Sequence, residues 1–446
     1  GDPARSRQRR GQRGNTTLWR AWRPAMIPLR LIARQLRLPA LLGFSLPVLL
    51  VAASCRAAHA APAARTGPAS AMASYDRQAY TPAVLQLSFN KSKTNDQDFL
   101  DLTLIPAQGE LVGRRVTVNQ DDFRQRLRAF YSQLAKQEPL RIEDPQSPAR
   151  SLYQLLLAPI EPELRRQGIT TLLLVPDAGL QAIPFAALHD GQSSFGERYA
   201  FSITPVLGLL PKDLPDQTSR DQHQLVLGAS RFDGLAPLPL VPQEMDRIAS
   251  LAPSEQHREE NFTPEVLITR AGDPSIRRLH LATHAEFQPG GPARSRIYAG
   301  KGTLDLRRFA SLRQRREGVP LELFVLSACR TAIGDPDSEL GFAGLALQAG
   351  ARSAIGTLWY VDDVATSVFF VQFYRYLERG LPKAEALQAT RRALASGQVR
   401  LVGDQIVGPD GQVLLDKLTP GQQRRVEAGL QHPFFWAGIA LIGTPW

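Results

Sequence analysis

Cysteine is scarce in this sequence, and its scarcity argues against a fold held together by disulfide bonds. The 446 residues contain two cysteines, Cys55 and Cys329. Cys55 lies in an Arg-rich leader, so removal of that leader would leave Cys329 without an intramolecular partner. A single thiol in a globular body is either a small buried side chain or a reactive group. With 43% hydrophobic residues, the chain can bury a core without disulfides or a structural metal.

The signatures of several other protein classes are missing as well. The sequence has no G-x-S-x-G elbow, which gives no support to a serine hydrolase of that type. It has no EF-hand loop and no internal repeat with a period of about 20–50 residues. An array of helical repeats is therefore not expected, and the sequence calls for no cofactor.

A net positive charge is absent from the body of the chain, although the whole sequence carries a net charge of +11. Residues 1–74 hold twelve arginines and one acidic residue, Asp2, which accounts for all of that charge. The remaining residues are balanced. We therefore expect no nucleic acid as a partner, because phosphate recognition requires a basic surface on the folded domain.

The leader, residues 1–60, has the order of a secretory signal peptide. Arginines precede an uncharged apolar run, Leu38–Ala53, and the small-x-small sequence Ala58-His59-Ala60 follows it. The run has 16 residues, fewer than the roughly 20 that cross a membrane, so we expect cleavage rather than a permanent anchor. We therefore expect the protein to be exported to the periplasm, the cell envelope or the extracellular space. Met26 is a natural alternative start.

Cys55 leaves one alternative open for the leader. Ala52-Ala53-Ser54-Cys55 faintly resembles a lipoprotein processing site but lacks the usual Leu three positions before Cys. Anchoring through the leader is the only membrane association that we expect. Residues 61–80, rich in Ala, Pro, Ser and Gly, are interpreted as a disordered tether.

Residues 81–147 are interpreted as a lead-in region with two strands and one helix. Ala83–Asn90 and Asp98–Ile105 have the apolar pattern of strands, and residues from Asp121 onward have helical spacing with Asp121 as the cap.

Residues 148–446 alternate between helices and short apolar strands. The predicted helices are Ser151–Gln167, Val361–Arg379 and Ala384–Leu394, and the predicted strands are Thr171–Val175, Gln224–Leu227, Leu279–Thr283, Leu321–Ser327, Ser353–Leu358 and Phe435–Ile442. Such alternation predicts an α/β fold in three layers, with a mostly parallel central sheet covered by helices on both faces. Two apolar runs within Gln398–Asp416 flank the turn Gly408-Pro409-Asp410-Gly411 and predict an inserted β-hairpin near the C-terminus.

Two of the predicted strands end in reactive residues. His284 follows Leu279–Thr283, and Cys329 follows Leu321–Ser327 by two residues. Parallel strands bring such residues to one edge of the sheet. A neighbouring imidazole can convert a thiol into the nucleophilic thiolate. A lone histidine or a cysteine at a strand end is also common as a structural residue.

Several segments resemble the core of CHAT-domain proteins, which are relatives of caspases and separases. These are HLATHAEF (280–287), LSACRTAIGD (326–335), GFAGLALQAGARSAIGTLWYVDD (341–363), VPDAGLQAIPFAALHDG (175–191) and HPFFWAGIALIGTPW (432–446). The resemblance implies a caspase-like fold, protein or peptide substrates, and a cysteine peptidase with His284 as base and Cys329 as nucleophile. The oligomeric state stays open, since caspase relatives differ.

One residue departs from the family's pattern. The family usually has Gly after the catalytic His, where it lends its N–H to the oxyanion, and here the residue is Ala285. The main-chain N–H groups of Ala285 and Cys329 are our candidates for the oxyanion hole. A side chain at position 285 restricts φ. A non-catalytic binding or scaffold module therefore stays open as an alternative, and so does another acyl hydrolase such as a thioesterase.

Acidic residues near strand ends suggest a pocket for a substrate's side chain. We expect Asp177, together with Asp362 and Asp363, to favour cleavage after basic residues, with Trp359 along the cleft. The alternatives are helix caps and turn residues for the aspartates and core packing for the tryptophan.

His280 and His284 form an H-x-x-x-H pair, but Leu281 stands where zinc peptidases have Glu, so we predict no metal site and a buried, hydrogen-bonded His280.

Overall fold

The computed structural model describes residues 82–92, 97–177, 179–204, 223–286, 294–327 and 346–446. The chain divides into two units, Gly1–Pro62 and Ala63–Trp446, and every described residue belongs to the second. The predicted leader, tether and Cys329 lie outside the described residues. Within the described ranges, no helix combines the length and the apolar character needed to cross a bilayer.

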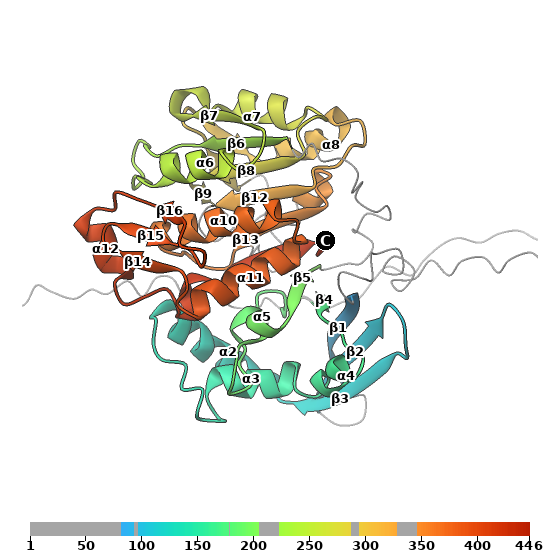
Figure 1. The fold of residues 1–446 in the computed structure, drawn as a ribbon. Helices are drawn as coiled ribbons and strands as arrows, with labels where there is room; N and C mark the ends of the chain where they lie inside the picture. The colour runs from blue at the N-terminus through green and yellow to red at the C-terminus, as the bar shows by residue number, and fades with distance from the viewer. Residues whose placement is uncertain (1–81, 93–96, 178, 205–222, 287–293, 328–345) are drawn as a thin grey trace, which may run out of the picture. The chain divides into compact units, whose positions relative to one another are not determined.

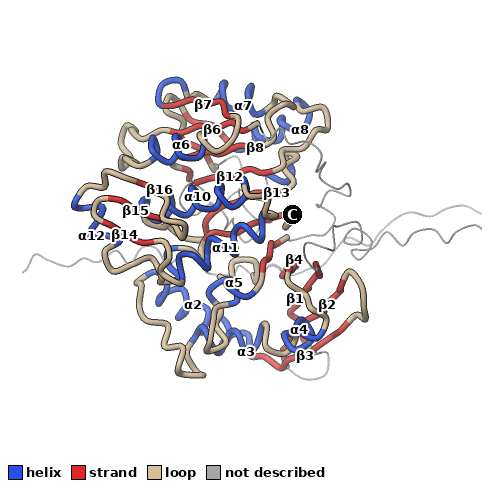
Figure 2. Tube along the Cα trace, viewed as in Figure 1, coloured by secondary structure: helices blue, strands red, loops and turns tan. Residues whose placement is uncertain are grey.

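Eleven strands form the central sheet, in the order β3-β2-β1-β4-β5-β17-β13-β12-β8-β6-β7 (Figures 1 and 2). In chain order they are β1 (Pro82–Lys91), β2 (Asp98–Pro106), β3 (Val112–Val118), β4 (Thr171–Pro176), β5 (Ala200–Ile203), β6 (Gln224–Gly228), β7 (Ser254–Arg258), β8 (Arg278–Ala282), β12 (Leu323–Ser327), β13 (Ser353–Thr357) and β17 (Ile439–Gly443). Two small sheets contain β9 (Ala285–Glu286), β10 (Arg296–Tyr298) and β11 (Thr303–Asp305), and β14 (Arg400–Val402), β15 (Gln405–Val407) and β16 (Val413–Leu415).

The described α-helices are α2 (Gln120–Ala135), α3 (Pro148–Leu156), α4 (Glu161–Arg166), α5 (Phe195–Arg198), α6 (Val241–Ala249), α7 (Pro264–Ala271), α8 (Leu312–Arg315), α10 (Asp363–Glu378), α11 (Lys383–Ala395) and α12 (Pro420–Val426). α10 packs between α6 and α11. The connections β6–α6–β7 and β7–α7–β8 cross the sheet in opposite directions, so right-handed crossovers place α6 and α7 on opposite faces. These features confirm the predicted α/β class with a mostly parallel sheet.

Apart from β2, which is antiparallel to both of its neighbours, the sheet consists of two blocks whose strands run in opposite directions. β13, β12, β8, β6 and β7 are mutually parallel. β17 is antiparallel to β13 but parallel to β5, which is parallel in turn to β4. The carboxyl end of β4 therefore lies at the opposite edge of the sheet from the carboxyl ends of β8 and β12. This reversal decides which sequence-predicted residues can share a site.

Short, mostly apolar segments form the central strands of the block that contains β13, β12, β8, β6 and β7. Every residue of β6, β8, β12 and β13 is buried. A strand covered by helices on both faces has no position that faces water, so a polar residue in it, such as His280 of β8, needs a hydrogen-bond partner.

Several expectations about individual elements need correction or extension. The lead-in region has a third strand, β3, and the last strand, predicted for Phe435–Ile442, is Ile439–Gly443. The helix predicted for Ser151–Gln167 is two helices, α3 and α4, separated by a segment that contains Pro159, because proline interrupts helical hydrogen bonding. Asn119, not Asp121, caps α2, and its side chain accepts from the N–H of Asp122. The predicted hairpin is present as β15 and β16, and β14 adds a third strand.

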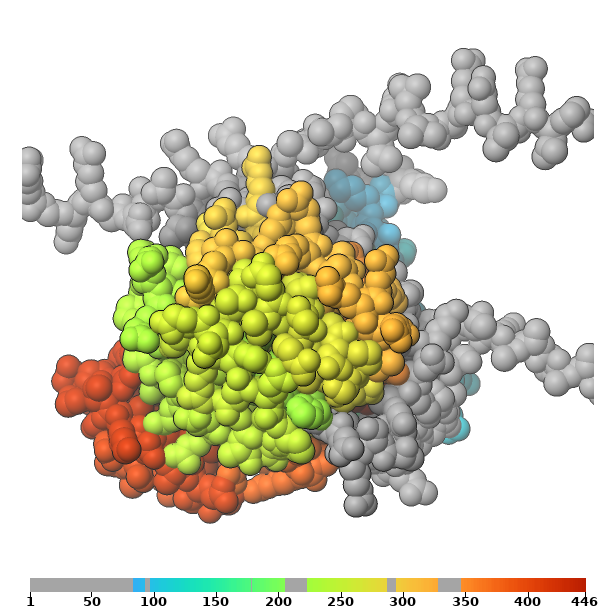
Figure 3. All heavy atoms as spheres, turned by 90° about the horizontal axis from the view of Figure 1, so that it is seen from above, coloured from blue at the N-terminus to red at the C-terminus, as the bar shows by residue number. Residues whose placement is uncertain are grey.

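The insertion, residues 398–432, is anchored to two helices by charged contacts. Asp416 accepts hydrogen bonds from Gln243 and Arg247 of α6, both at 2.9 Å. Asp410 accepts from Arg375 and Arg379 near the end of α10, both at 2.6 Å. In Figure 3 the orange-red C-terminal residues lie alongside the yellow-green segment that includes α6. The insertion thus fixes α6 relative to α10.

Candidate active site

His284 follows β8, and its imidazole is held by a main-chain oxygen and an aromatic ring. Its Nε2 donates a hydrogen bond to the carbonyl of Ala236 at 2.7 Å. The ring of Phe232 contacts the imidazole edge on, with centroids 4.7 Å apart. A carbonyl oxygen can only accept, so the hydrogen must be on Nε2. Nδ1 is then the atom of this ring that can accept a proton.

The ends of β8 and β12 lie side by side in the sheet. Ala282 pairs with Ser327 in parallel register, and the N–H of Thr283 donates to the Ser327 oxygen at 3.4 Å. His284 comes two residues after Ala282, and Cys329 comes two residues after Ser327. His284 and Cys329 therefore each come two residues after a member of the same strand pair, Ala282 and Ser327.

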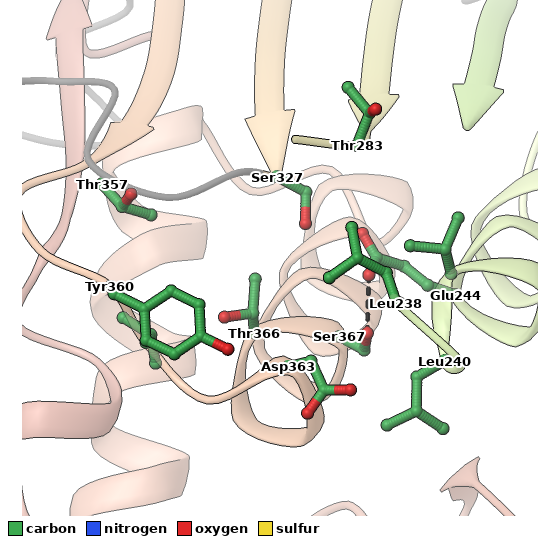
Figure 4. Close-up of a pocket in the computed structure, with 12 residues that line it drawn as sticks. Leu238, Leu240, Glu244, Thr283, Ser327, Thr357, Tyr360, Asp363, Thr366 and Ser367 are labelled. Atoms are coloured by element: carbon green, nitrogen blue, oxygen red, sulfur yellow. Dashed lines mark hydrogen bonds between the residues drawn. The ribbon is translucent and has the colours of Figure 1, made fainter. Parts of the chain in front are cut away.

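A pocket opens directly beside these strand ends (Figure 4). It encloses about 450 Å³, including the open solvent at its mouth. Its lining comes from the segment before α6 and α6 itself, from the strand ends, and from the start of α10: Leu238, Leu240, Val241 and Glu244; Thr283, Ser327 and Thr357; Tyr360, Val361, Asp363, Thr366 and Ser367. Two of these residues carry carboxylates, and none of this lining is basic.

A buried hydrogen-bond network forms part of the pocket wall. The Ser367 hydroxyl donates to Oε2 of Glu244 at 2.6 Å, the contact dashed in Figure 4. His280 contacts the other carboxylate oxygen, with Nε2 and Oε1 2.8 Å apart. All three side chains are buried. This confirms the prediction that His280 is a buried, hydrogen-bonded strand residue. The described residues contain no group of three or more His, Cys, Asp or Glu side chains that could hold a metal ion.

Ala285 begins β9 and pairs with Ile297 of β10. The carbonyl oxygen of His284 accepts from the N–H of Tyr298 at 3.0 Å, which secures the same segment. Strand backbone is extended, a conformation that any residue adopts. The side chain at position 285 therefore costs no backbone strain here, and the substitution of Gly by Ala is compatible with the local fold.

In a comparison with protein families, one family model matches two thirds of the sequence. Residues 146–444 match the model of the CHAT domain. The chain belongs to the CHAT domain family. Human tetratricopeptide repeat protein 28 is 22% identical over an alignment 354 residues long, which covers 67% of this chain and 13% of that protein. The chain thus spans a small part of that relative's length.

Solved structures with similarity to this CHAT-domain chain are more distant in sequence. The Saccharomyces cerevisiae separase in complex with securin has 11% identity and a TM-score of 0.45, over 84% of this chain and 30% of the separase chain. Gingipain R, described as an Arg-specific cysteine proteinase, has 10% identity and a TM-score of 0.40, over 66% of this chain and 68% of its own.

Asp177 does not reach the pocket of this CHAT domain. It follows β4, in the block of opposite polarity, five strands from β8 and therefore roughly 24 Å away at the usual strand spacing. Its carboxylate accepts from the N–H of Phe89 at 3.0 Å, and its own N–H donates to Leu87 at 2.9 Å. Asp177 thus connects β1 to the end of β4. This is a structural role, of the kind given above as the alternative to a place in the substrate pocket.

Trp359 and Asp362 are structural neighbours of the pocket rather than part of its lining. The Trp359 indole is buried and donates through Nε1 to the Phe434 oxygen at 3.0 Å. Asp362 caps α10, accepting from the N–H of Val364 at 2.9 Å. Burial raises the pKa of the Asp362 carboxyl, and the nearby Arg425 guanidinium opposes that rise.

Asp363 is the one sequence-predicted acid that lines the pocket, and Arg425 pairs with it at 2.9 Å. Glu244 and Ser367 were not anticipated. A signal for Glu244 exists in the sequence, because it falls at an apolar position of α6, whose other buried residues are Val241, Met245 and Ile248. A carboxylate at a core position is informative, since buried charges require specific partners.

Proposed function

We propose that this CHAT-domain chain is a cysteine peptidase in which His284 is the general base and Cys329 the nucleophile. The observation that carries the proposal is the pairing of Ala282 with Ser327, because each candidate follows that pair by two residues. The open pocket beside Thr283 and Ser327 offers room for a substrate side chain next to the reacting groups. Membership of the CHAT family supports the same assignment.

The proposed reaction uses the free nitrogen of His284. Nδ1 takes the thiol proton from Cys329, and the sulfur attacks the carbonyl carbon of the scissile peptide bond. The main-chain N–H groups of Ala285 and Cys329 would stabilise the oxyanion. The C–N bond breaks, and the imidazolium returns the proton to the leaving amine. Water then hydrolyses the thioester, releasing the acid and restoring the thiol.

The proposed substrates are proteins or peptides cut after basic residues. Two carboxylates, Glu244 and Asp363, line the pocket, and none of the lining residues is basic, although Arg425 pairs with Asp363 from outside the lining. A lysine or arginine side chain would find complementary charge there. We further propose that the protein is exported through its leader, which secretion of an epitope-tagged chain, and loss of secretion without Leu38–Ala53, would test.

Thiol labelling and peptide cleavage test the proposed dyad. The full chain would be treated with iodoacetamide and with a mixed-sequence peptide library, beside the variants Cys329→Ala and His284→Ala. Cys55→Ala is the matched control, because it removes the other thiol and leaves the domain intact. We expect cleavage to vanish in both dyad variants and to persist in Cys55→Ala. Absence of cleavage in the wild type, with Cys329 alkylated at the rate of a free thiol, would favour a non-catalytic binding module instead.

A further inference from the structure

Glu244 is a carboxylate placed where the fold would ordinarily place an apolar side chain. It lies on the inner face of α6 and is 1% exposed, yet it forms part of the pocket wall. Burying a carboxylate is costly unless its oxygens are satisfied and its charge is compensated. The partners of Glu244 therefore indicate what the residue is for.

Both partners of Glu244 satisfy its oxygens without supplying a positive charge. The Ser367 hydroxyl is neutral. The Nδ1 atom of His280 is buried and has no hydrogen-bond partner. An imidazolium would leave an N–H there unpaired, so the contacts favour the neutral tautomer, in which Nε2–H donates to Oε1 of Glu244. The carboxylate is held in place by these two contacts, and no lysine or arginine of the described residues forms an ion pair with it.

Asp363, the other carboxylate of the pocket, is in the opposite situation. Arg425 of the insertion contacts Asp363 at 2.9 Å and Asp362 at 2.9 Å. The guanidinium already provides Asp363 with an ion pair. A ligand cation would gain less from Asp363 than from Glu244, because part of the attraction is already cancelled.

We propose that Glu244, oriented by His280 and Ser367, is the residue that binds the cationic side chain of the substrate in this pocket. The inference rests on the proposed function, because it names the group that would select basic residues for cleavage. Leu238 and Leu240 line the same pocket and would pack along the aliphatic stem of that side chain. The guanidinium would then meet a carboxylate whose position is fixed before binding, which lowers the cost of association.

Binding of agmatine, which carries the alkylguanidinium of arginine and has no scissile bond, tests the inference without relying on catalysis. The full chain would be titrated calorimetrically with agmatine and with neutral butylurea. We expect measurable agmatine binding and a loss of about tenfold in Glu244→Gln, the size expected for one charge-assisted hydrogen bond. Asp363→Asn is the matched control, and we expect it to lose less than about threefold, because Arg425 already pairs with that residue.

Three results would overturn the assignment: agmatine binding no tighter than butylurea, unchanged affinity in Glu244→Gln, or an equal loss in Asp363→Asn. Circular dichroism would confirm that each variant folds. If Glu244→Gln does not fold, Glu244→Asp takes its place, since it keeps the charge but withdraws it by one methylene; severalfold weaker binding is then expected, and wild-type affinity would refute the proposal.

The same samples separate failure of the inference from failure of the proposed function. Peptides with arginine or isosteric citrulline before the scissile bond would be compared, and the ratio of their kcat/KM values should fall about tenfold in Glu244→Gln while citrulline cleavage persists. Cleavage with an unchanged ratio would refute the role of Glu244 alone. Agmatine binding without any cleavage would refute the peptidase and leave the cation site.

Discussion

The ring of Phe232 contacts the imidazole of His284 edge on, with ring centroids 4.7 Å apart. This contact and the hydrogen bond to the Ala236 carbonyl fix the imidazole from two directions. Without the phenyl ring, the imidazole could rotate about its Cα–Cβ bond and lose the orientation of Nδ1 that the proposed dyad requires. The aromatic residue is therefore expected to position the base rather than to bind substrate.

Phe232→Ala should lower kcat about tenfold, a barrier increase of about 1.4 kcal/mol, while KM changes less than about twofold. Steady-state kinetics on a cleavable peptide would measure both constants. Leu235→Ala, at an exposed position of the same segment, is the control and should leave both constants unchanged. A rise in KM with normal kcat would mean that Phe232 contacts substrate instead.

Lys383, which does not line the pocket, should make the free energy of unfolding depend on pH. Its buried Nζ donates to the Glu322 main-chain oxygen at 2.6 Å and to the Ser353 hydroxyl at 2.8 Å. Burial lowers the pKa of Lys383 to about 7, from the usual 10.5. Between these two values the unfolded chain binds one more proton than the folded chain. The free energy of unfolding should therefore rise with pH in this window, by up to about 1.4 kcal/mol per pH unit from this group.

Lys383→Met should remove that slope, and it should stabilise the protein most at and below pH 7, where the cost of burying the ammonium is fully present. Urea unfolding at several pH values between 7 and 10 would measure the difference between variant and wild type. Lys301→Met, at an exposed lysine, should leave the slope as it is. An equal slope in Lys383→Met and the wild type would contradict the assigned pKa.

Gly438 packs so closely on Trp359 that it leaves no room for a side chain. A Cβ at Gly438 would come within 2.6 Å of the indole ring. Gly438→Ala should therefore destabilise the protein by about 1–3 kcal/mol through overpacking. In Gly421→Ala, the control, the nearest atom to the new Cβ would be 3.8 Å away, and the free energy of unfolding should change by no more than about 0.5 kcal/mol. Equal urea midpoints for the two variants would show that Trp359 is not packed as described.

Most strands near the centre of the sheet were predictable because they are short, mostly apolar segments between helices. β7 was not, since its sequence, Ser254–Arg258, contains no aliphatic residue, and an edge strand needs none. β5 was missed because four residues, Ala200–Ile203, are too few to show a pattern. Short and edge strands acquire their structure from pairing with neighbours, which a local pattern cannot reveal.

The candidate site could be predicted only in part for a related reason. The sequence places His284 at a strand end, but it does not show the direction of each strand. Asp177 was grouped with His284 on the assumption of one polarity, and the antiparallel pairing of β13 with β17 puts it at the other edge. Glu244 and Ser367 are 123 residues apart in the sequence, so only the packing of α6 against α10 brings them together.

Among the described strands, β3 and β7 are the outermost strands of the sheet, and both carry charged side chains. On β3 the exposed residues include Arg114 and Arg115. Charged side chains on an outermost strand hinder pairing with the same strand of a second copy, because like charges in adjacent strands repel. These charges therefore disfavour the pairing of edge strands between molecules. Such pairing would extend the sheet from one chain to the next, as in insoluble fibrils.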